Sequence, residues 1–213
     1  MSSASRQASS DAADGRELIL AAAIRSFSEV GYDGTTTAGV ARAAGVTQPL
    51  VHHHFGSKEG LWRAAMAHLF SEVRMFTKLD PALPPMQALL GATERFVRMV
   101  AARPEITRVI AREGTAESPR LNHLIDEYLG EQFREIVDML EAGQATGLVN
   151  PDVRPDLLLF FVLGAGSHVF DVSALARKSL GIDTTAEKTR DDFVGLVLSV
   201  LTSGVFRAPA GAR

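Results

Sequence analysis

The sequence predicts an all-α protein of about nine helices, and three observations support this. Hydrophobic residues recur every three or four positions through most of the 213 residues, which is the period of an amphipathic helix. Glycine and proline mostly fall between these periodic stretches, where they begin or end helices. No stretch alternates polar and apolar residues for long enough to form a convincing strand. We therefore expect no sheet.

The chain begins with a polar tail and one amphipathic helix. Residues 1–14 are small and polar, so we expect a disordered tail there. A helix follows over about residues 16–30, and Gly31 is placed to stop it.

A short second helix follows in the stretch "TTTAGVARAAG". Thr36 or Thr37 is placed to cap its first turn, and Gly45 is placed to end it. The residues that we expect in the core of this region are Val40, Ala44, Val46 and Phe55.

Two more helices start soon afterwards. Thr47 caps the third, whose first turn accepts Pro49 because the amides there have no helical partner. This helix ends near Phe55, and Ser57 in "GSKE" caps the fourth. Gly60 stands where the glutamate of a capping box would be, so the box is incomplete.

The remaining sequence predicts longer helices between breakers. We expect them at about 85–103, 104–114, 118–147, 155–180 and 185–205. A first-turn proline opens several of them, as in Ser118-Pro119.

Composition excludes several classes of protein. The chain has no cysteine, which removes disulfides, thiolate chemistry and cysteine-based zinc sites. Its first residues have no apolar run of the kind that a signal peptide needs. The longest apolar stretch, residues 157–170, contains glycines and a histidine and is shorter than the ~20 residues of a membrane span. We expect a cytoplasmic protein that does not enter a membrane.

The second and third helices are joined by the tight turn "GVT". Gly45 supplies a positive-φ residue, Val46 packs the corner and Thr47 begins the next helix. This is the pattern of a helix-turn-helix, whose second helix places its N-terminal residues in the DNA major groove. Net charge is −3, but between Gly34 and Lys58 there are two basic residues and no acidic one. The electrostatic signal for DNA is therefore local and weak.

A longer stretch makes the prediction specific. "GYDGTTTAGVARAAGVTQPLVHHHFGSKEGLW" resembles the DNA-binding signature of the TetR family of transcriptional regulators. It shares a glycine before a Thr pair, an Ala-rich helix closing in "AAGV", a short helix ending in an aromatic residue, and "SKE". The likeness spans about residues 16–62. The rest resembles the family only in its helical layout, which implies an effector-binding and dimerisation domain.

Three consecutive histidines, His52, His53 and His54, need an explanation. Family members commonly carry a Tyr-aromatic-His run here that contacts phosphates, so the resemblance implies DNA-backbone contacts for all three. The usual tyrosine is replaced at position 52, but an imidazole N–H still donates to a phosphate, with more pH dependence. A metal site fails on geometry, because consecutive helical side chains point about 100° apart and cannot converge on one ion. We expect no cofactor.

The resemblance also implies DNA contacts for other side chains. Thr36 and Thr37 match a Thr pair that reaches a phosphate at a helix start. The alternative is that they only cap the helix and contact no DNA. Lys58 matches the lysine of "SKE", a backbone contact, although it can also be an ordinary solvated lysine. The first turn of the third helix faces the groove and consists of Thr47, Gln48, Pro49 and Leu50.

Two of the polar side chains can read bases. Gln48 can pair bidentately with adenine. Arg42, on the second helix, can reach a phosphate or a guanine, or can pair with Glu29 or Asp33 instead.

Polar residues on apolar stripes are the candidates for an effector site. A lone His or Glu on such a stripe is more often a satisfied core or interface residue, and both interpretations stay open. The lining of a cavity is assigned to Phe96, Met99, Tyr128 and Phe161, and its polar contacts to Arg112, Glu113 and His168. The surplus of Phe and Met predicts a neutral or weakly ionised, largely hydrophobic small molecule.

The last helix carries small residues four apart on one face, which lets two helices approach closely. With small residues on the preceding helix, this predicts a four-helix interface between two subunits, although a single-chain core can use the same stripe. The interface is assigned to Gly164, Ser167, Gly195, Leu196, Ser199 and Ser203.

The sequence thus predicts a helix-turn-helix domain over residues 15–62, a ligand-binding and dimerisation domain over 63–206, and a tail over 207–213. The hypothesis is a homodimeric regulator, more specifically a repressor, that binds a palindromic operator and is released by a small hydrophobic effector. One alternative is a regulator of the same fold that responds to a protein partner or activates. The other is a helical enzyme using His168 and Glu113, but no nucleophile elbow, phosphate loop or metal spacing supports it, so we expect no enzyme.

Overall fold

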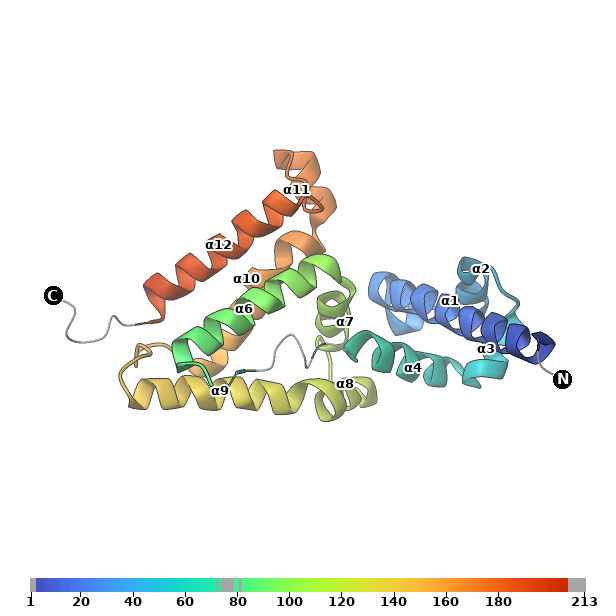
Figure 1. Cartoon of the computed structure of the whole chain (residues 1–213), viewed down its shortest axis with the longest axis horizontal. Helices are drawn as coiled ribbons and strands as arrows, with labels where there is room; N and C mark the ends of the chain where they lie inside the picture. The colour runs from blue at the N-terminus through green and yellow to red at the C-terminus, as the bar shows by residue number, and fades with distance from the viewer. Residues whose placement is uncertain (1–2, 72, 74–78, 81, 207–213) are drawn as a thin grey trace. The chain divides into compact units, whose positions relative to one another are not determined.

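The structure is a computed structural model that describes residues 3–71, 73, 79–80 and 82–206. The tail predicted over 207–213 lies outside the described residues. Within them the chain is helical, and its only β-type pairing is an isolated bridge between Val149 and Phe206. The predicted all-α class is confirmed (Figure 1).

The chain divides into two compact units, which we describe separately. The first unit, here called the head, comprises the described residues of Met1–Ser71 and the segment Arg108–Leu121. The second, here called the body, comprises the described residues of Glu72–Thr107 and Asn122–Arg213. The head therefore includes a segment that comes from the later part of the sequence.

Four helices make up most of the head: α1 (Ser3–Gly34), α2 (Thr37–Ala44), α3 (Gln48–Phe55) and α4 (Lys58–Phe70) (Figure 1). Both α2 and α4 pack against α1, and α3 contacts the other three. The core between them contains the chain's single tryptophan, fully buried on α4, and apolar residues of every helix: Ile19, Leu20, Phe27, Val40, Val51, Leu61, Trp62 and Met66.

The two ends of α1 differ in how well they were predicted. Gly31 has a left-handed φ of 75° inside the assigned helix, so it breaks the regular helix where the sequence predicted a stop. At the other end α1 starts at Ser3, and residues 3–14 are helical instead of the disordered tail that we expected. This segment is rich in alanine and extends a helix that is already packed, so it needs no new nucleus.

The predicted core of the helix-turn-helix is only partly confirmed. Val40 is buried, whereas Ala44, Val46 and Phe55 are half-buried. Val51, which sequence reasoning did not single out, is fully buried on α3. In a helix of only eight residues a single side chain is enough to anchor the inner face.

The body is built around α6 (Pro85–Ala102), which contacts α9 (Gly130–Ala145), α10 (Pro155–Asp171) and α12 (Glu187–Gly204). At Gly166 on α10 an added Cβ would lie 2.9 Å from the ring of Phe96, so glycine lets these two helices pack closely. Between α6 and α9 the chain forms α7 (Glu105–Glu113), α8 (Pro119–Leu124) and a π-helical turn, η1 (Ile125–Leu129).

The helix predicted over 118–147 is interrupted by that π-helical turn. The amide of Gly130 donates to the carbonyl of Ile125, five residues back, as in a π-helix. An added Cβ on Gly130 would lie 2.9 Å from that same carbonyl oxygen, so the missing side chain leaves room for the wider turn. The predicted cap is confirmed, because the Ser118 hydroxyl accepts from the amide of Leu121 at 3.0 Å.

The helix predicted over 155–180 is likewise two helices. After α10 the chain bends by 65° into α11 (Ser173–Leu180). No single described helix is long and apolar enough to cross a membrane, and only this bent pair meets the criteria of length and composition together.

Candidate nucleic-acid interface

The turn between α2 and α3 has the predicted geometry. Gly45 adopts φ 70° and ψ 25°, and its amide donates to the carbonyl of Arg42 at 3.2 Å. The next amide, of Val46, donates to the carbonyl of Ala41 at 3.0 Å. This left-handed cap ends α2 sharply and starts α3 two residues later. The two helices therefore form a helix-turn-helix pair.

The start of α2 lies beside the start of α3. The Thr36 hydroxyl accepts from the amide of Gly39 at 3.0 Å, which confirms Thr36 as the cap. The side-chain amide of Gln48 donates to the hydroxyl of Thr37 at 3.5 Å. Polar groups from both helix starts thus occupy one neighbourhood, as binding to a DNA strand requires.

The first turn of α3 is mostly exposed. Thr47, Gln48 and Pro49 lie at the surface, and Thr47 begins the helix in an extended conformation without a side-chain capping bond. Leu50 differs, because it is half-buried and its Cδ2 lies 3.7 Å from where a Cβ on Gly15 would be. Leu50 therefore lies against α1 with part of its side chain exposed, and its contact with the groove stays a prediction.

The three histidines have separate environments. His52 and His53 are exposed, and Nδ1 of His52 lies 3.2 Å from the carbonyl oxygen of Gly56. His54 is half-buried, and its Nε2 is enclosed without a hydrogen-bond partner. The phosphate contact predicted for His54 stays a prediction, and of the three histidines it is the least exposed. Among the described residues, no group of three or more His, Asp or Glu is arranged to hold a metal ion.

Ser57 and Gly60 fix the start of α4 beside the end of α3. The Ser57 hydroxyl accepts from the amide of Gly60 at 3.0 Å, which confirms the predicted cap. At Gly60 an added Cβ would lie 2.2 Å from the backbone oxygen of Phe55, so no larger residue fits. The incomplete capping box thus has a steric reason.

Lys58 and Arg42 are both available to a polyanion. The ammonium of Lys58 lies 4.4 Å from the ring centroid of Tyr32 and 3.5 Å from the carbonyl oxygen of Asp33. Arg42 is exposed on α2, and within the described part of the chain it makes no ion pair with Glu29 or Asp33. The pairing that the sequence left open for Arg42 is thus not formed.

Sequence reasoning missed a cluster around Tyr32. The guanidinium of Arg120 lies 4.1 Å from the Tyr32 ring centroid, and its Nε donates to a Glu113 carboxylate oxygen at 3.1 Å. Burial raises the pKa of the Tyr32 phenol, and the charge of Glu59 and a hydrogen bond to it raise it further. Only the proximity of Tyr32 to the Thr pair was visible in the sequence, because Arg120 is distant along the chain.

The residues predicted to line an effector site are divided between the head and the body. Phe96 and Met99 are buried on α6, and Tyr128 stands edge-on to His123 with ring centroids 5.7 Å apart. Arg112 and Glu113 belong to the head, where Arg112 donates to the backbone carbonyls of Ser28 and Glu29. Their proposed role as ligand contacts stays a prediction.

Phe161 and His168, also predicted to line the effector site, are exposed on α10. Phe161 is 54% exposed and His168 is exposed, seven positions further along α10. Both lie on the outward side of α10, where Gly164 is also exposed. Because α10 is apolar on nearly every side, its spacing did not reveal which side is buried.

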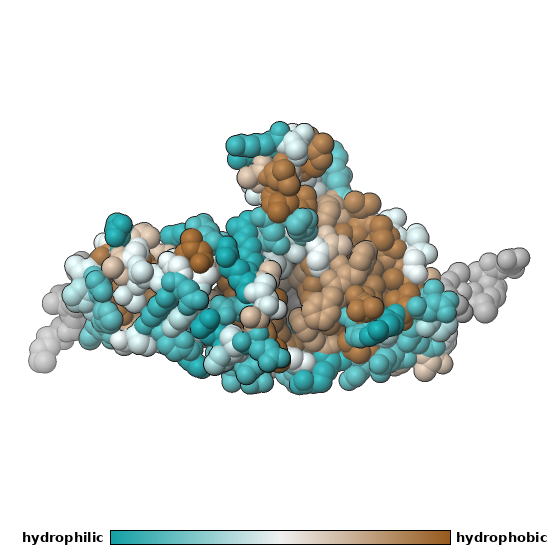
Figure 2. Space-filling view, turned by 180° about the vertical axis from the view of Figure 1, so that it is seen from behind, coloured by the Kyte–Doolittle hydropathy of each residue, from teal (hydrophilic) through white to brown (hydrophobic). Residues whose placement is uncertain are grey.

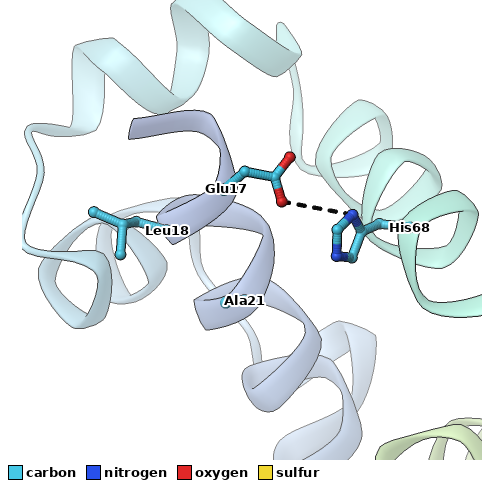
Figure 3. A pocket seen from close by; sticks show the side chains of 4 residues that line it. All are labelled: Glu17, Leu18, Ala21 and His68. Carbon is cyan, nitrogen blue, oxygen red and sulfur yellow. Dashed lines mark ion pairs between the residues drawn. The ribbon is translucent and has the colours of Figure 1, made fainter. Parts of the chain in front are cut away.

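A pocket of about 550 Å³ lies between α1 and α4 of the head (Figure 3). It is lined by Glu17, Leu18, Ala21 and His68, and Nδ1 of His68 lies 3.7 Å from a carboxylate oxygen of Glu17. Figure 3 shows Glu17 pointing toward His68 and Leu18 pointing away from it. The pocket is open to solvent and has none of the predicted site residues, so it does not match the expected effector cavity.

The predicted interface residues lie mainly on exposed faces of α10 and α12. Gly164, Gly195, Leu196, Ser199 and Ser203 are exposed, and an added Cβ on either glycine would meet no atom within 4 Å. Large apolar side chains share these helices and stay exposed: Leu157, Phe160, Phe161, Leu196 and Val200. Figure 2 shows apolar residues gathered over a broad face of the body.

Ser167 is the exception among the predicted interface residues. It is 6% exposed, and its hydroxyl donates to the carbonyl of Leu163 at 2.8 Å. It faces the core of the body, one position from Gly166, so its place in the interface stays a prediction that its burial does not support.

Comparisons with known proteins agree with this arrangement. The sequence-family model for bacterial regulatory proteins of the tetR family matches residues 19–65. The sequence-family model for the tetracyclin repressor-like C-terminal domain matches residues 85–200. The HTH-type transcriptional repressor NicS of Pseudomonas putida is 28% identical over 143 residues, 65% of this chain and 67% of that protein. The HTH-type transcriptional regulator RutR of Escherichia coli K12 is 24% identical over 204 residues, 89% of this chain and 90% of that protein.

Solved structures show the same fold. The ketosteroid transcriptional regulator KstR2 of Mycobacterium tuberculosis superposes with a TM-score of 0.65 at 23% identity, covering 91% of this chain and 95% of that one. The family resemblance of residues 16–62 is confirmed, and the later part of the chain matches a C-terminal domain of the same class. The chain therefore belongs to the TetR family of bacterial transcriptional regulators.

Proposed function

We propose that this regulator binds a palindromic operator as a homodimer, represses transcription, and is released by a small hydrophobic effector. The observation that carries DNA binding is the exposed start of α3, where Gln48 is held beside Thr37 by the Gly45 turn. An eight-residue helix presented this way fits the major groove, and its first turn meets base edges. Arg42, His52, His53 and Lys58 are the proposed phosphate contacts.

Dimerisation is supported by the outward faces of α10 and α12. On α12, Leu196 and Val200 are 57% and 49% exposed and lie beside small residues. Exposing large apolar side chains to water is unfavourable, and small residues beside them would let a second helix pack closely. Two copies of the face formed by these two helices would make a four-helix interface. A two-fold dimer binds a palindrome with half-sites about one helical turn, ~34 Å, or a multiple apart.

Repression and release by an effector are supported by relatives. NicS is named a repressor, and KstR2 of Mycolicibacterium smegmatis, 27% identical over 165 residues, is also named a repressor. The match to a tetracyclin repressor-like C-terminal domain fits a ligand-responsive body. Phe161 and His168 are exposed on α10, where they are accessible to another protein. This favours the second candidate, a regulator of this fold that responds to a protein partner instead of a small molecule.

The decisive experiment is selection of bound DNA from a random duplex pool. The purified protein should retain duplexes that share an inverted repeat. Retention of a single half-site sequence would contradict the dimeric mode, and a pool without enrichment would contradict sequence-specific binding. A catalytic function of Glu113 with His168 receives no support from the contacts of Glu113, whose carboxylate pairs with Arg120.

A further inference from the structure

The segment Arg108–Leu121 joins the head through two arginines. Arg112 donates to the carbonyl of Ser28 at 2.9 Å and also to that of Glu29, the last turn of α1 before the break at Gly31. The guanidinium thus lies at the carbonyl side of this last turn, where the helix dipole favours a cation. Eight positions later, Arg120 lies over the ring of Tyr32.

Two cations lie near the Tyr32 ring. The Arg120 guanidinium carbon lies 4.1 Å and the Lys58 ammonium 4.4 Å from the ring centroid. Both distances are well within the range of a cation–π contact. Phe27 stacks with the same ring, with centroids 6.0 Å apart and the planes 9° from parallel. Trp62 contacts the ring edge-on, with centroids 6.5 Å apart.

The charged groups around the Tyr32 ring differ in whether an opposite charge pairs with them. Arg120 is neutralised by Glu113, whose side chain is only 10% exposed, so the guanidinium is pinned in place. Arg63 donates to Glu59 at 3.0 Å, which steadies the carboxylate that holds the Tyr32 hydroxyl. Lys58 has only the Asp33 carbonyl at 3.5 Å, and in the described part of the chain no carboxylate pairs with it.

We propose that Tyr32 and Arg120 are positioning residues that hold the Lys58 ammonium ready for a DNA phosphate. A free lysine side chain has several rotatable bonds, and ordering it costs affinity at the moment of binding. The contact with the Tyr32 ring orders the Lys58 side chain before DNA binds. At most one of the three N–H donors of the ammonium is used on the Asp33 carbonyl, which leaves two for a phosphate. This inference rests on the proposed DNA-binding function.

The experiment uses the full-length protein and a short mixed-sequence DNA duplex, because phosphate contacts do not depend on sequence. Arg120→Met removes the charge and keeps the length of the side chain. We expect affinity to fall roughly two- to fivefold, as loss of a partly exposed cation–π contact predicts. Arg120→Lys should restore most of the loss. Arg177→Met on α11 removes one exposed arginine from the body and is the matched control, with affinity unchanged.

A double-mutant cycle separates positioning from a general structural role. In a Lys58→Ala background, Arg120→Met should have no further effect, because the residue that it positions is gone. Tyr32→Leu, which removes the ring but keeps an apolar side chain, should show the same loss and the same dependence on Lys58. Each variant is first checked for an unchanged melting temperature.

Two outcomes overturn the inference. One is an equal loss from Arg120→Met with and without Lys58, and the other is wild-type or tighter binding by Arg120→Met. If the wild-type protein itself shows no salt-dependent binding to any duplex, the proposed DNA-binding function fails instead. The two failures are therefore distinguishable.

Discussion

At the scale of single residues, Gly60 is a position that has no room for a side chain. An added Cβ would lie 2.2 Å from the backbone oxygen of Phe55, and that atom cannot move without shifting the end of α3. We expect Gly60→Ala to lower the free energy of unfolding by about 1–3 kcal/mol, the usual cost of overpacking. Chemical denaturation measures this. Gly204→Ala is the control, because a Cβ there meets no atom within 4 Å, and a similar loss in both variants would refute the steric account.

Gln48 and Lys58 should differ in what they do for DNA binding. Gln48 lies at the exposed start of α3, so Gln48→Ala should cost about 1–3 kcal/mol at one base position and relax specificity there. Lys58→Ala should weaken all sequences about equally and lower the slope of log affinity against log salt by about one. Titrations of the selected operator and of single-base variants at several salt concentrations give both values. Exchanged effects would show that the two roles are assigned wrongly.

At the scale of secondary-structure elements, α12 carries the clearest prediction. Ser199 is exposed in the middle of its outward face, between Gly195 and Ser203. Ser199→Leu should overpack a close helix pair by about 1–3 kcal/mol and give monomers that bind operator poorly. Sedimentation equilibrium measures the shift toward monomer. Ala142→Leu, on an exposed position of α9, is the control and should leave the oligomeric state unchanged, whereas a dimeric Ser199→Leu protein would place the interface elsewhere.

Which elements could be predicted depends on how local their signals are. The caps at Thr36, Ser57 and Ser118 were predictable, because a hydroxyl and an amide three residues away decide them. The π-helical turn was not, because Gly130 only permits the wider turn and does not by itself require it. Which face of α10 is buried could not be predicted either, because α10 carries apolar residues on nearly all of its faces. Only its packing against α6 places Gly166 on the buried face.

The site shows the same division. The exposed start of α3 follows from the left-handed turn at Gly45, whereas the capping bond predicted for Thr47 is not formed. The contact of Arg120 with Tyr32 joins residues 88 positions apart, since 120 − 32 = 88, and no periodicity reports it. The contact of Arg112 with α1 could not be predicted either, because its partners are backbone carbonyls that carry no sequence signal.

At the scale of the whole molecule, the prediction concerns the effector. If a small molecule releases the operator, linkage requires that a ligand that weakens DNA binding tenfold bind the DNA-bound form ~1.4 kcal/mol less well. We expect a thermal-shift screen of apolar metabolites to yield such a ligand, and its effect on operator affinity to be measurable by titration. Phe161→Ala should leave the ligand response intact, because Phe161 lies on the outside of α10. A screen without any stabilising compound would favour the protein-partner alternative.

The position of Trp62 gives the molecule a built-in optical reporter. It is the only tryptophan, it is fully buried, and it belongs to the head, edge-on to Tyr32. Indole emission shifts to longer wavelength when water reaches the ring, so selective excitation of tryptophan reads the head alone. Circular dichroism reads the helices of both units at once. Comparing the two signals during unfolding would show whether the DNA-binding unit melts with the rest of the chain or by itself, without any label.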